Sequence, residues 1–162
     1  MARIGWWTRT SGKLVALVSR GLSKRTSDLH LALYRRTGGR LGGNIGPLPT
    51  LLLTTTGRKS GRPRTVPINY LRDGADYVVI ASNSGRDAPP LWLLNLQSDP
   101  HATIEIGAAT LPVLARPATA EEQSRLWPKL ISRAYNYEEY RNHTARPIPL
   151  LILQPQERQE TG

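Results

Sequence analysis

The sequence predicts a small, mainly β protein in which the strands form a β-barrel and helices lie at its periphery. From residue 50 onward the apolar residues follow the two-residue period of strands and fall into five or six short runs. Short strands with peripheral helices favour a small barrel over a doubly wound sheet. The 162 residues are enough for one domain with a core, and too few for two.

The N-terminal part divides from the barrel by composition. We expect a basic amphipathic helical arm over residues 1–36, a Gly- and Pro-rich connection over 37–49, the barrel over 50–155 and a polar tail over 156–162. In the arm, apolar side chains share one helix face from Leu14 to Leu22, and Thr26 to Asp28 can cap a second helix. The arm either packs on its own domain or lies on an anionic membrane.

The strands are expected in sequence order over residues 51–56, 65–72 and 76–82, with Asp73 and Gly74 forming the tight turn between the second and third. Residues 102–106 and 110–116 form a second hairpin, and 147–153 a last strand. Pro67 lies inside the second run and cannot donate a backbone hydrogen bond. It therefore predicts an irregular or edge strand with backbone left free on one side.

Three helical segments are expected among these strands. Pro90 starts a short helix through residue 96, because proline suits the first turn of a helix. Thr119 is the expected cap of an amphipathic helix that reaches about residue 133. Residues 135–141 form a tyrosine-rich turn or helix.

The net charge of +10 is concentrated in the first part of the chain. Residues 1–64 contain thirteen Lys and Arg against the single acid Asp28, whereas residues 65–162 contain nine bases and eleven acids. Such a distribution indicates a phosphate-rich ligand, nucleic acid or an anionic membrane as partner. No DNA- or RNA-binding motif accompanies the charge, so we expect no nucleic-acid partner.

Several classes of site are disfavoured by composition. The chain has no cysteine, and its three histidines lie far apart without metal-ligand spacing, so we expect no metal site. No apolar stretch approaches the roughly 20 residues that span a bilayer, and the N-terminus lacks a signal-peptide pattern. We therefore expect a cytoplasmic protein, either free or held peripherally at the inner face of the membrane.

The segment over residues 54–70, TTTGRKSGRPRTVPINY, contains four cations in and directly after a turn that closes on Gly57 and Gly61. These cations are Arg58, Lys59, Arg62 and Arg64. A hairpin that closes on the two glycines can direct backbone N–H groups and guanidinium forks toward one phosphate or carboxylate. The turn is either such an anion cradle or an ordinary solvated turn.

Three separated motifs, LLLTTTGRKSGRPRTVPINYLRDG, VIASNSG and PLWLLNLQSDP, occur in one order within residues 51–100, and the similarity they belong to extends from about residue 33 to 155. Together they resemble the deazaflavin-dependent nitroreductase family, the split β-barrel quinone reductases that use coenzyme F420. That resemblance implies an FMN-binding-like split barrel. It also implies a bound 8-hydroxy-5-deazaflavin whose phospholactyl, oligoglutamate tail supplies anions for the cradle.

The resemblance also implies roles for individual residues. Arg58, Lys59 and Arg64 would hold the anions of the tail, while Arg62 has no secure match. The cofactor ring would contact Val66, Pro67, Ile68, Ser82, Asn83 and Gly85, with Trp92 and Asn95 supporting the pocket. From the residues alone, Trp92 could equally be core, and Ser82 and Asn83 ordinary turn residues.

Reduced deazaflavin donates a hydride, so the protein must also align an acceptor and supply a proton. Tyr137 and Tyr140, with Ser82, are the catalytic candidates, because their hydroxyls can bind or protonate an acceptor oxygen. Ala134 and Asn69 depart from the family pattern, which leaves the substrate open between quinone-like and nitroaromatic compounds. The sequence predicts no oligomeric state.

We therefore expect an F420H2-dependent reductase that transfers a hydride to a quinone-like, nitroaromatic or other conjugated acceptor. One alternative is an FMN-dependent enzyme of the same fold, since FMN also needs cations for its phosphate. The other is a non-catalytic protein that binds deazaflavin or a membrane surface.

Overall fold

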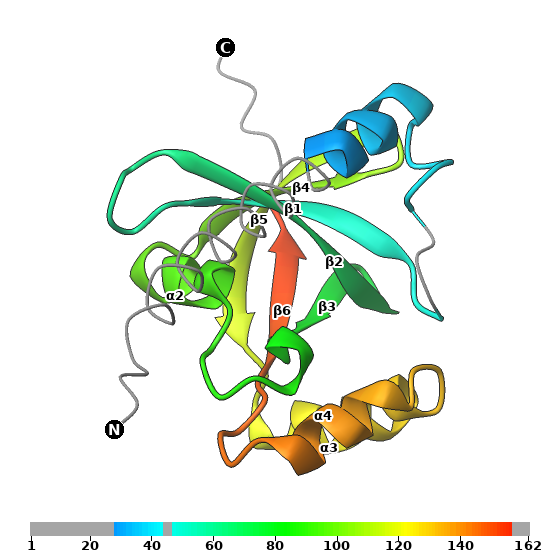
Figure 1. Ribbon diagram of the computed structural model, residues 1–162, viewed down its shortest axis with the longest axis vertical. Helices are drawn as coiled ribbons and strands as arrows, with labels where there is room; N and C mark the ends of the chain where they lie inside the picture. The colour runs from blue at the N-terminus through cyan, green and yellow to red at the C-terminus, as the bar shows by residue number, and fades with distance from the viewer. Residues whose placement is uncertain (1–27, 44–46, 157–162) are drawn as a thin grey trace, which may run out of the picture.

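The computed structural model describes residues 28–43 and 47–156, and in this part the chain forms a closed antiparallel barrel with helices at its periphery (Figure 1). The strands are β1 (Thr50–Thr56), β2 (Pro63–Asp73), β3 (Asp76–Ile80), β4 (His101–Ile106), β5 (Ala109–Pro117) and β6 (Leu150–Pro155). The helices are α2 (Leu91–Ser98), α3 (Ala120–Ile131), α4 (Asn136–His143), the 3₁₀ turn η1 (Asn83–Gly85) and a helical segment over residues 28–37. The predicted small barrel with peripheral helices is confirmed.

The barrel order is β1-β2-β3-β6-β5-β4, with β4 pairing back onto β1. Consecutive strands form the hairpins β1–β2, β2–β3 and β4–β5. The β2–β3 turn places Gly74 at a φ of +62°, where a side chain would be strained, as expected for the predicted Asp-Gly turn. The last strand, β6, begins three residues later than predicted and is inserted between β3 and β5.

Strand β2 pairs with a different neighbour in each of its two parts, with β1 over residues 63–69 and with β3 over residues 70–73. Its partner β1 is in register from Thr50 opposite Asn69 to Thr56 opposite Pro63. On its other side, β3 pairs only with residues 70–73 of β2. Residues 63–69 therefore present a free backbone edge, which confirms the irregular edge position predicted from Pro67 and makes the barrel a split one.

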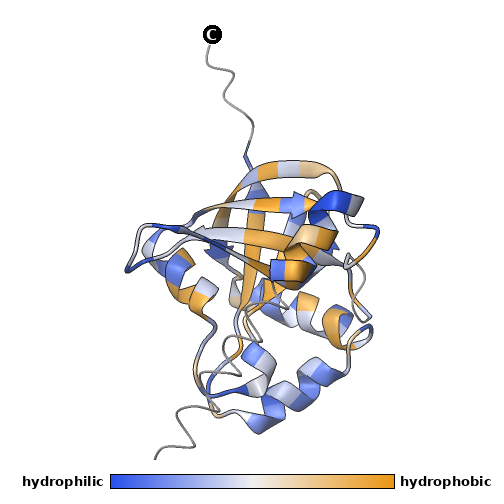
Figure 2. Cartoon of the chain, turned by 45° about the horizontal axis from the view of Figure 1, so that its top comes forward, coloured by the Kyte–Doolittle hydropathy of each residue, from blue (hydrophilic) through white to orange (hydrophobic). Residues whose placement is uncertain are grey.

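Two apolar clusters hold the fold together. One fills the barrel and includes Leu51, Leu53 and Val79; the other lies between the outer face of the barrel and the helices α3 and α4, and includes Leu126 and Tyr137. Figure 2 shows hydrophobic residues running along the barrel strands. Alternate residues of a strand face opposite sides of the sheet, so β2 and β3 contribute to both clusters.

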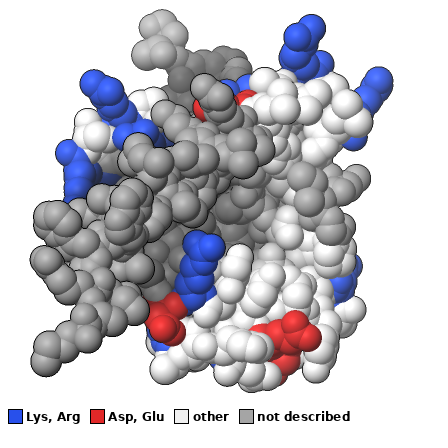
Figure 3. Space-filling view, in the orientation of Figure 1, with Lys and Arg blue, Asp and Glu red and all other residues white. Residues whose placement is uncertain are grey.

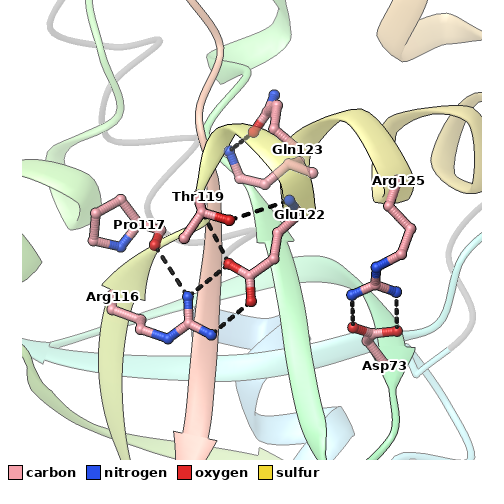
Figure 4. A network of polar contacts seen from close by, with 8 residues as sticks. Asp73, Arg116, Pro117, Thr119, Glu122, Gln123 and Arg125 are labelled. Atoms are coloured by element: carbon pink, nitrogen blue, oxygen red, sulfur yellow. Dashed lines mark hydrogen bonds and ion pairs between the residues drawn. The ribbon is translucent and has the colours of Figure 1, made fainter.

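Helix α3 begins with the cap predicted at Thr119. Its side chain accepts a hydrogen bond from the Glu122 backbone N–H, and the Glu122 carboxylate accepts from the Thr119 N–H, forming a capping box. Arg116 of β5 binds the same carboxylate with two nitrogens, and Arg125 binds Asp73 of β2 in the same way (Figure 4). These ion pairs fix α3 against the barrel.

The predicted N-terminal arm is described only from residue 28 onward, and its first 27 residues lie outside the described part. The helical segment over residues 28–37 agrees with the second helix predicted there. No helix of residues 28–43 and 47–156 is long and apolar enough to cross a bilayer. On the face drawn in Figure 3, the Lys and Arg side chains of described residues project at separate places and do not gather in one patch.

Candidate active site

The turn between β1 and β2 is tight and well defined. Gly57 donates its N–H to the Arg62 carbonyl at 2.8 Å, and the Gly61 N–H donates back to the Gly57 carbonyl at 2.7 Å. Gly61 has a φ of +64°, and a Cβ on Gly57 would lie 2.7 Å from the Ser60 hydroxyl oxygen. Glycine is therefore favoured at both ends, and the hydrogen bonds hold the backbone of Arg58 and Lys59, which lie between them, in one conformation.

Helix α2 anchors this turn through Asn95, whose side chain is 7% exposed. Its Oδ1 accepts a hydrogen bond from the Arg58 backbone N–H at 3.1 Å, and its Nδ2 donates to the Thr55 hydroxyl at 3.0 Å. The amide of Asn95 is thus occupied by the protein. Asn95 therefore supports the turn from α2.

A cavity of about 990 Å³ opens beside this turn and is here called the cradle cavity. Arg58, Lys59 and Arg64 all line it with exposed side chains, whereas Arg62 does not line it. Within residues 28–43 and 47–156, none of these three cations has a carboxylate within ion-pair distance. Asp28 lines the same cavity, so three cations stand there against one carboxylate, and this excess of positive charge is suited to binding phosphate or carboxylate groups.

A second cavity of about 480 Å³, here called the ring cavity, follows the free edge of β2. It lies between that edge, the loop after β3, the start of α2 and helix α4. Its lining comprises Val66, Pro67, Ile68, Asn69, Ile80, Ser82, Asn83, Ser84, Pro90, Leu91, Trp92 and Tyr137.

The edge of β2 offers backbone groups to this cavity. The Tyr70 N–H donates to the Pro49 carbonyl at 3.0 Å, and neighbouring residues of a strand alternate the direction of their backbone groups. The backbone polar groups of Pro67 and Asn69 therefore point away from β1, toward the free edge. A planar heterocycle placed along this edge could hydrogen-bond to them.

The loop after β3 has an unusual backbone conformation. Asn83 and Ser84 both adopt positive φ values, of 47° and 55°, which are uncommon for residues other than glycine. Arg146 holds the loop by donating from Nη2 to the Ser82 carbonyl at 2.7 Å and from Nε to the Arg86 carbonyl at 2.9 Å. The loop is therefore held in one conformation at the rim of the ring cavity.

Ser82 is 7% exposed, and its hydroxyl makes no hydrogen bond to another described residue. No side-chain oxygen in the described part is both fully buried and unpaired, so the hydroxyl keeps some accessible surface. Because Ser82 lines the ring cavity, a molecule bound there could contact it.

Gly85 has a different position from the one implied by the resemblance. It lines neither cavity; instead, a Cβ at Gly85 would lie 3.2 Å from the Tyr140 Cα. Its φ of +73° and this close approach let the loop after β3 pack on α4. In the structure Gly85 thus serves packing between these two elements.

Tyr137 of α4 forms the polar end of the ring cavity and is 7% exposed. Its hydroxyl oxygen accepts a hydrogen bond from Asn69 Nδ2 at 3.3 Å. Burial raises the pKa of Tyr137 above that of a free tyrosine, while the hydrogen bond from Asn69 acts in the opposite direction. Tyr140 lies behind it, with ring centroids 5.7 Å apart, and does not line the cavity.

The two cavities are neighbours that share Val66, Leu91 and Trp92. Trp92 is 8% exposed and also packs in the barrel cluster, so it is both core and cavity wall. The cationic turn and the buried Tyr137 hydroxyl thus belong to one extended site. An elongated ligand with an anionic end fits this arrangement.

The structure brings together most of the residues selected from the sequence and adds others. The additions that line the ring cavity are Asn69, Ile80, Ser84, Pro90 and Leu91, and those that line the cradle cavity are Asp28, Leu31, Thr55, Gly57, Ser60, Pro63, Thr65 and Leu91. No sequence pattern indicated that Arg146 holds the loop after β3, because 64 residues separate Arg146 from Ser82. Asn69 could have been selected from the sequence, because it is a polar residue inside a predicted strand.

Comparisons with known proteins show the family of this chain. The family model for F420H2-dependent quinone reductase matches residues 26–155. An F420H2-dependent quinone reductase of Mycobacterium tuberculosis is 40% identical over 129 residues, which are 77% of this chain and 87% of that protein.

Solved structures show the same fold. A structure described as the F420H2-dependent reductase FDR-A is 34% identical, with a TM-score of 0.60 over 65% of this chain and 94% of that one. The haem storage protein HutZ of Vibrio cholerae, 19% identical, has a TM-score of 0.51 over 67% of this chain and 82% of its own, and shares the fold alone.

Proposed function

Because the chain belongs to the F420H2-dependent quinone reductase family and is an oxidoreductase with F420H2 as its hydride donor, we propose that its two cavities bind different parts of the reactants. The cradle cavity holds the anionic tail of the cofactor. The ring cavity holds the deazaflavin ring and the quinone-type acceptor. The observation that carries this proposal is the continuity of the two cavities through Val66, Leu91 and Trp92.

The cradle suits the tail because its cations are exposed, are carried by a backbone that hydrogen bonds hold in place, and have no ion pair with a described residue. Arg58, Lys59 and Arg64 bind the phosphate and glutamate carboxylates, and Asn95 keeps the turn in place from α2. Such exposed cations also attract an anionic ligand from a distance. We therefore assign most of the affinity for the cofactor to this turn.

The ring cavity suits a flat, partly polar heterocycle. Val66 and Ile68 offer apolar contact, while the outward carbonyl of Pro67 offers a hydrogen-bond acceptor. Ser82 and Asn83 supply polar groups at the rim opposite β2. Trp92 closes the side next to the cradle and keeps water from the buried end.

When bound, the reduced deazaflavin supplies the hydride. The protein must then hold the acceptor and deliver a proton to its oxygen, and Tyr137 is the described residue placed to do so. Tyr140 supports the Tyr137 ring, and its own hydroxyl is not assigned to the acceptor. The acceptors covered by this proposal are quinone-like compounds and, as a second class, nitroaromatic compounds.

Titration with oxidised coenzyme F420, followed by its fluorescence, tests the proposal. We expect saturable quenching at micromolar concentrations, and no quenching would refute the cofactor assignment. Denaturation of the purified protein is expected to release no flavin. Released flavin would favour the FMN-dependent alternative. Turnover of menadione by the protein and F420H2 distinguishes the enzyme from a non-catalytic binder.

A further inference from the structure

Asn69 sits between the barrel and α4 at the end of the free edge of β2. Its side chain makes two hydrogen bonds to residues that are distant in sequence. The Thr50 hydroxyl donates to Oδ1 at 3.0 Å, and Nδ2 donates to the Tyr137 hydroxyl oxygen at 3.3 Å. The amide therefore connects β1 to the proposed proton donor.

The first bond determines the direction of the second. Thr50 is 5% exposed, and its backbone N–H is already bonded to the Gly43 carbonyl at 2.7 Å. Its hydroxyl proton occupies Oδ1 of Asn69, which turns the NH₂ group of the amide toward Tyr137. The phenol oxygen is thus an acceptor on that side.

A phenol has one proton, and Tyr137 cannot donate it to a group that is itself a donor. Among the described residues, the Tyr137 hydroxyl has no hydrogen-bond partner besides Asn69. Because Tyr137 lines the ring cavity, its proton is left to point into that cavity. A quinone oxygen there would meet a donor that is already oriented.

We infer that Asn69 is a positioning residue that keeps the Tyr137 hydroxyl oriented as a proton donor toward the acceptor. This inference rests on the proposed function of Tyr137. As a hydride adds to the quinone, the O–H bond of Tyr137 breaks and a new O–H bond forms on the quinone oxygen. The quinone becomes a hydroquinone, the cofactor is oxidised, and the phenolate regains its proton from water.

Asn69 also favours the product side of this proton transfer. After donation, the phenolate keeps the hydrogen bond from Nδ2, which is stronger to an anion than to a neutral phenol. Burial and the neighbouring Tyr140 both disfavour the phenolate, and the other residues of the cluster around Tyr137 are apolar apart from the indole of Trp127. The amide of Asn69 is therefore the described group that offsets this cost.

The substitution Asn69→Asp tests the orientation with almost no change in shape. An ionised carboxylate can only accept, so it would take the Tyr137 proton away from the cavity. A protonated carboxyl can accept from Thr50 and donate to Tyr137, as the amide does. The single-turnover rate of menadione reduction should therefore be close to wild type at low pH and fall about tenfold or more as the new carboxyl ionises.

The matched control is Asn142→Asp, which makes the same charge change at an exposed position of α4. It should keep the wild-type pH profile. In a Tyr137→Phe background, Asn69→Asp should add no further pH-dependent loss, because both changes act on the same proton. If Asn69→Asp fails to fold, Thr50→Val removes the donor to Oδ1 and should lower the rate in the same assay.

The outcomes separate this inference from the proposed function. If Tyr137→Phe slows reduction while Asn69→Asp shows the wild-type rate at every pH, the orientation by Asn69 is wrong and the role of Tyr137 stands. A loss in Asn69→Asp that is equal at all pH values also contradicts the orientation, because it indicates a structural effect. A wild-type rate in Tyr137→Phe overturns both, whereas quenching by oxidised F420 reports cofactor binding independently.

Discussion

The cradle cavity and the ring cavity adjoin each other but are built in opposite ways. The cradle places exposed cations on a short glycine-bounded turn, where water and salt screen them. The ring cavity places the hydroxyls of Ser82 and Tyr137 on residues that are each 7% exposed. Exposed charge can capture a ligand but orients it weakly, whereas buried groups orient it strongly. Affinity and reaction rate should therefore respond to different substitutions.

Tyr137→Phe is expected to give the largest difference between the effect on reaction rate and the effect on cofactor affinity. Loss of the proton donor should lower the single-turnover rate of menadione reduction by about 100-fold, as is typical when a general acid is removed. The affinity for oxidised F420, measured by fluorescence, should not change. Tyr135→Phe is the control, because Tyr135 is 69% exposed and lines neither cavity. Equal losses of rate and affinity would contradict the division of roles.

The reverse effect is expected from Lys59→Ala combined with Arg64→Ala. Removing two cations should weaken the binding of oxidised F420 by about tenfold or more, since a hydrogen bond to a charged group contributes about 1.5–3 kcal/mol before screening. The rate at saturating cofactor should stay near wild type, and the salt dependence of binding should become shallower.

Arg62→Ala is the matched control for that pair, because Arg62 belongs to the same turn and does not line the cradle cavity. It should leave both affinity and rate unchanged. A loss of affinity in Arg62→Ala as large as in the double variant would show that general charge, and not a defined cradle, attracts the cofactor.

A smaller effect on binding is expected from Asn95→Ala, which removes the anchor of the cradle and not a cation. The variant should lose about 1–3 kcal/mol of unfolding free energy, because the Arg58 N–H and the Thr55 hydroxyl lose their partner. Denaturant unfolding measures this loss, and cofactor affinity should fall less than in the cation variant. Gln97→Ala, at an exposed position of α2, is the control; unchanged stability in Asn95→Ala would refute the anchor.

The smallest effect on either cavity is expected from Glu122→Gln, because Glu122 lies on α3. Arg116, followed by the Thr119 backbone N–H, lowers the Glu122 pKa from 4.5 to about 2. The ionised form therefore stabilises the fold above about pH 4.5, and this contribution is lost as the pH falls toward 2. In Glu122→Gln, the free energy of unfolding should fall less steeply than in wild type as the pH is lowered from about 4.5 toward 2.

Binding of oxidised F420 and menadione reduction by the Glu122→Gln variant should match wild type at pH 7. Glu121→Gln is the control, because Glu121 lies in the same helical turn without an ion pair to a described residue. An acid limb that is equally steep in Glu122→Gln and wild type would contradict the assignment to Glu122.

Much of this arrangement was predictable because its determinants are local. Alternating apolar residues predicted the strands, Pro67 predicted the one-sided pairing of β2, and Thr119 with Glu122 predicted the start of α3. The cationic turn was predictable for the same reason, since its glycines and cations occupy eight consecutive residues. The last strand was predicted three residues early, because Pro147 and Ile148 extend the apolar run that becomes β6.

The barrel class, the cationic turn and, through resemblance, the deazaflavin chemistry were all predictable from the order of residues along the chain. Only the tertiary structure joined the two cavities, assigned Gly85 to packing against α4 and placed Asn69 between Thr50 and Tyr137. The physical reason is the range of each determinant. Turns, caps and strand periods depend on near neighbours, whereas the Asn69–Tyr137 contact spans 68 residues and exists only after β2 and α4 pack together.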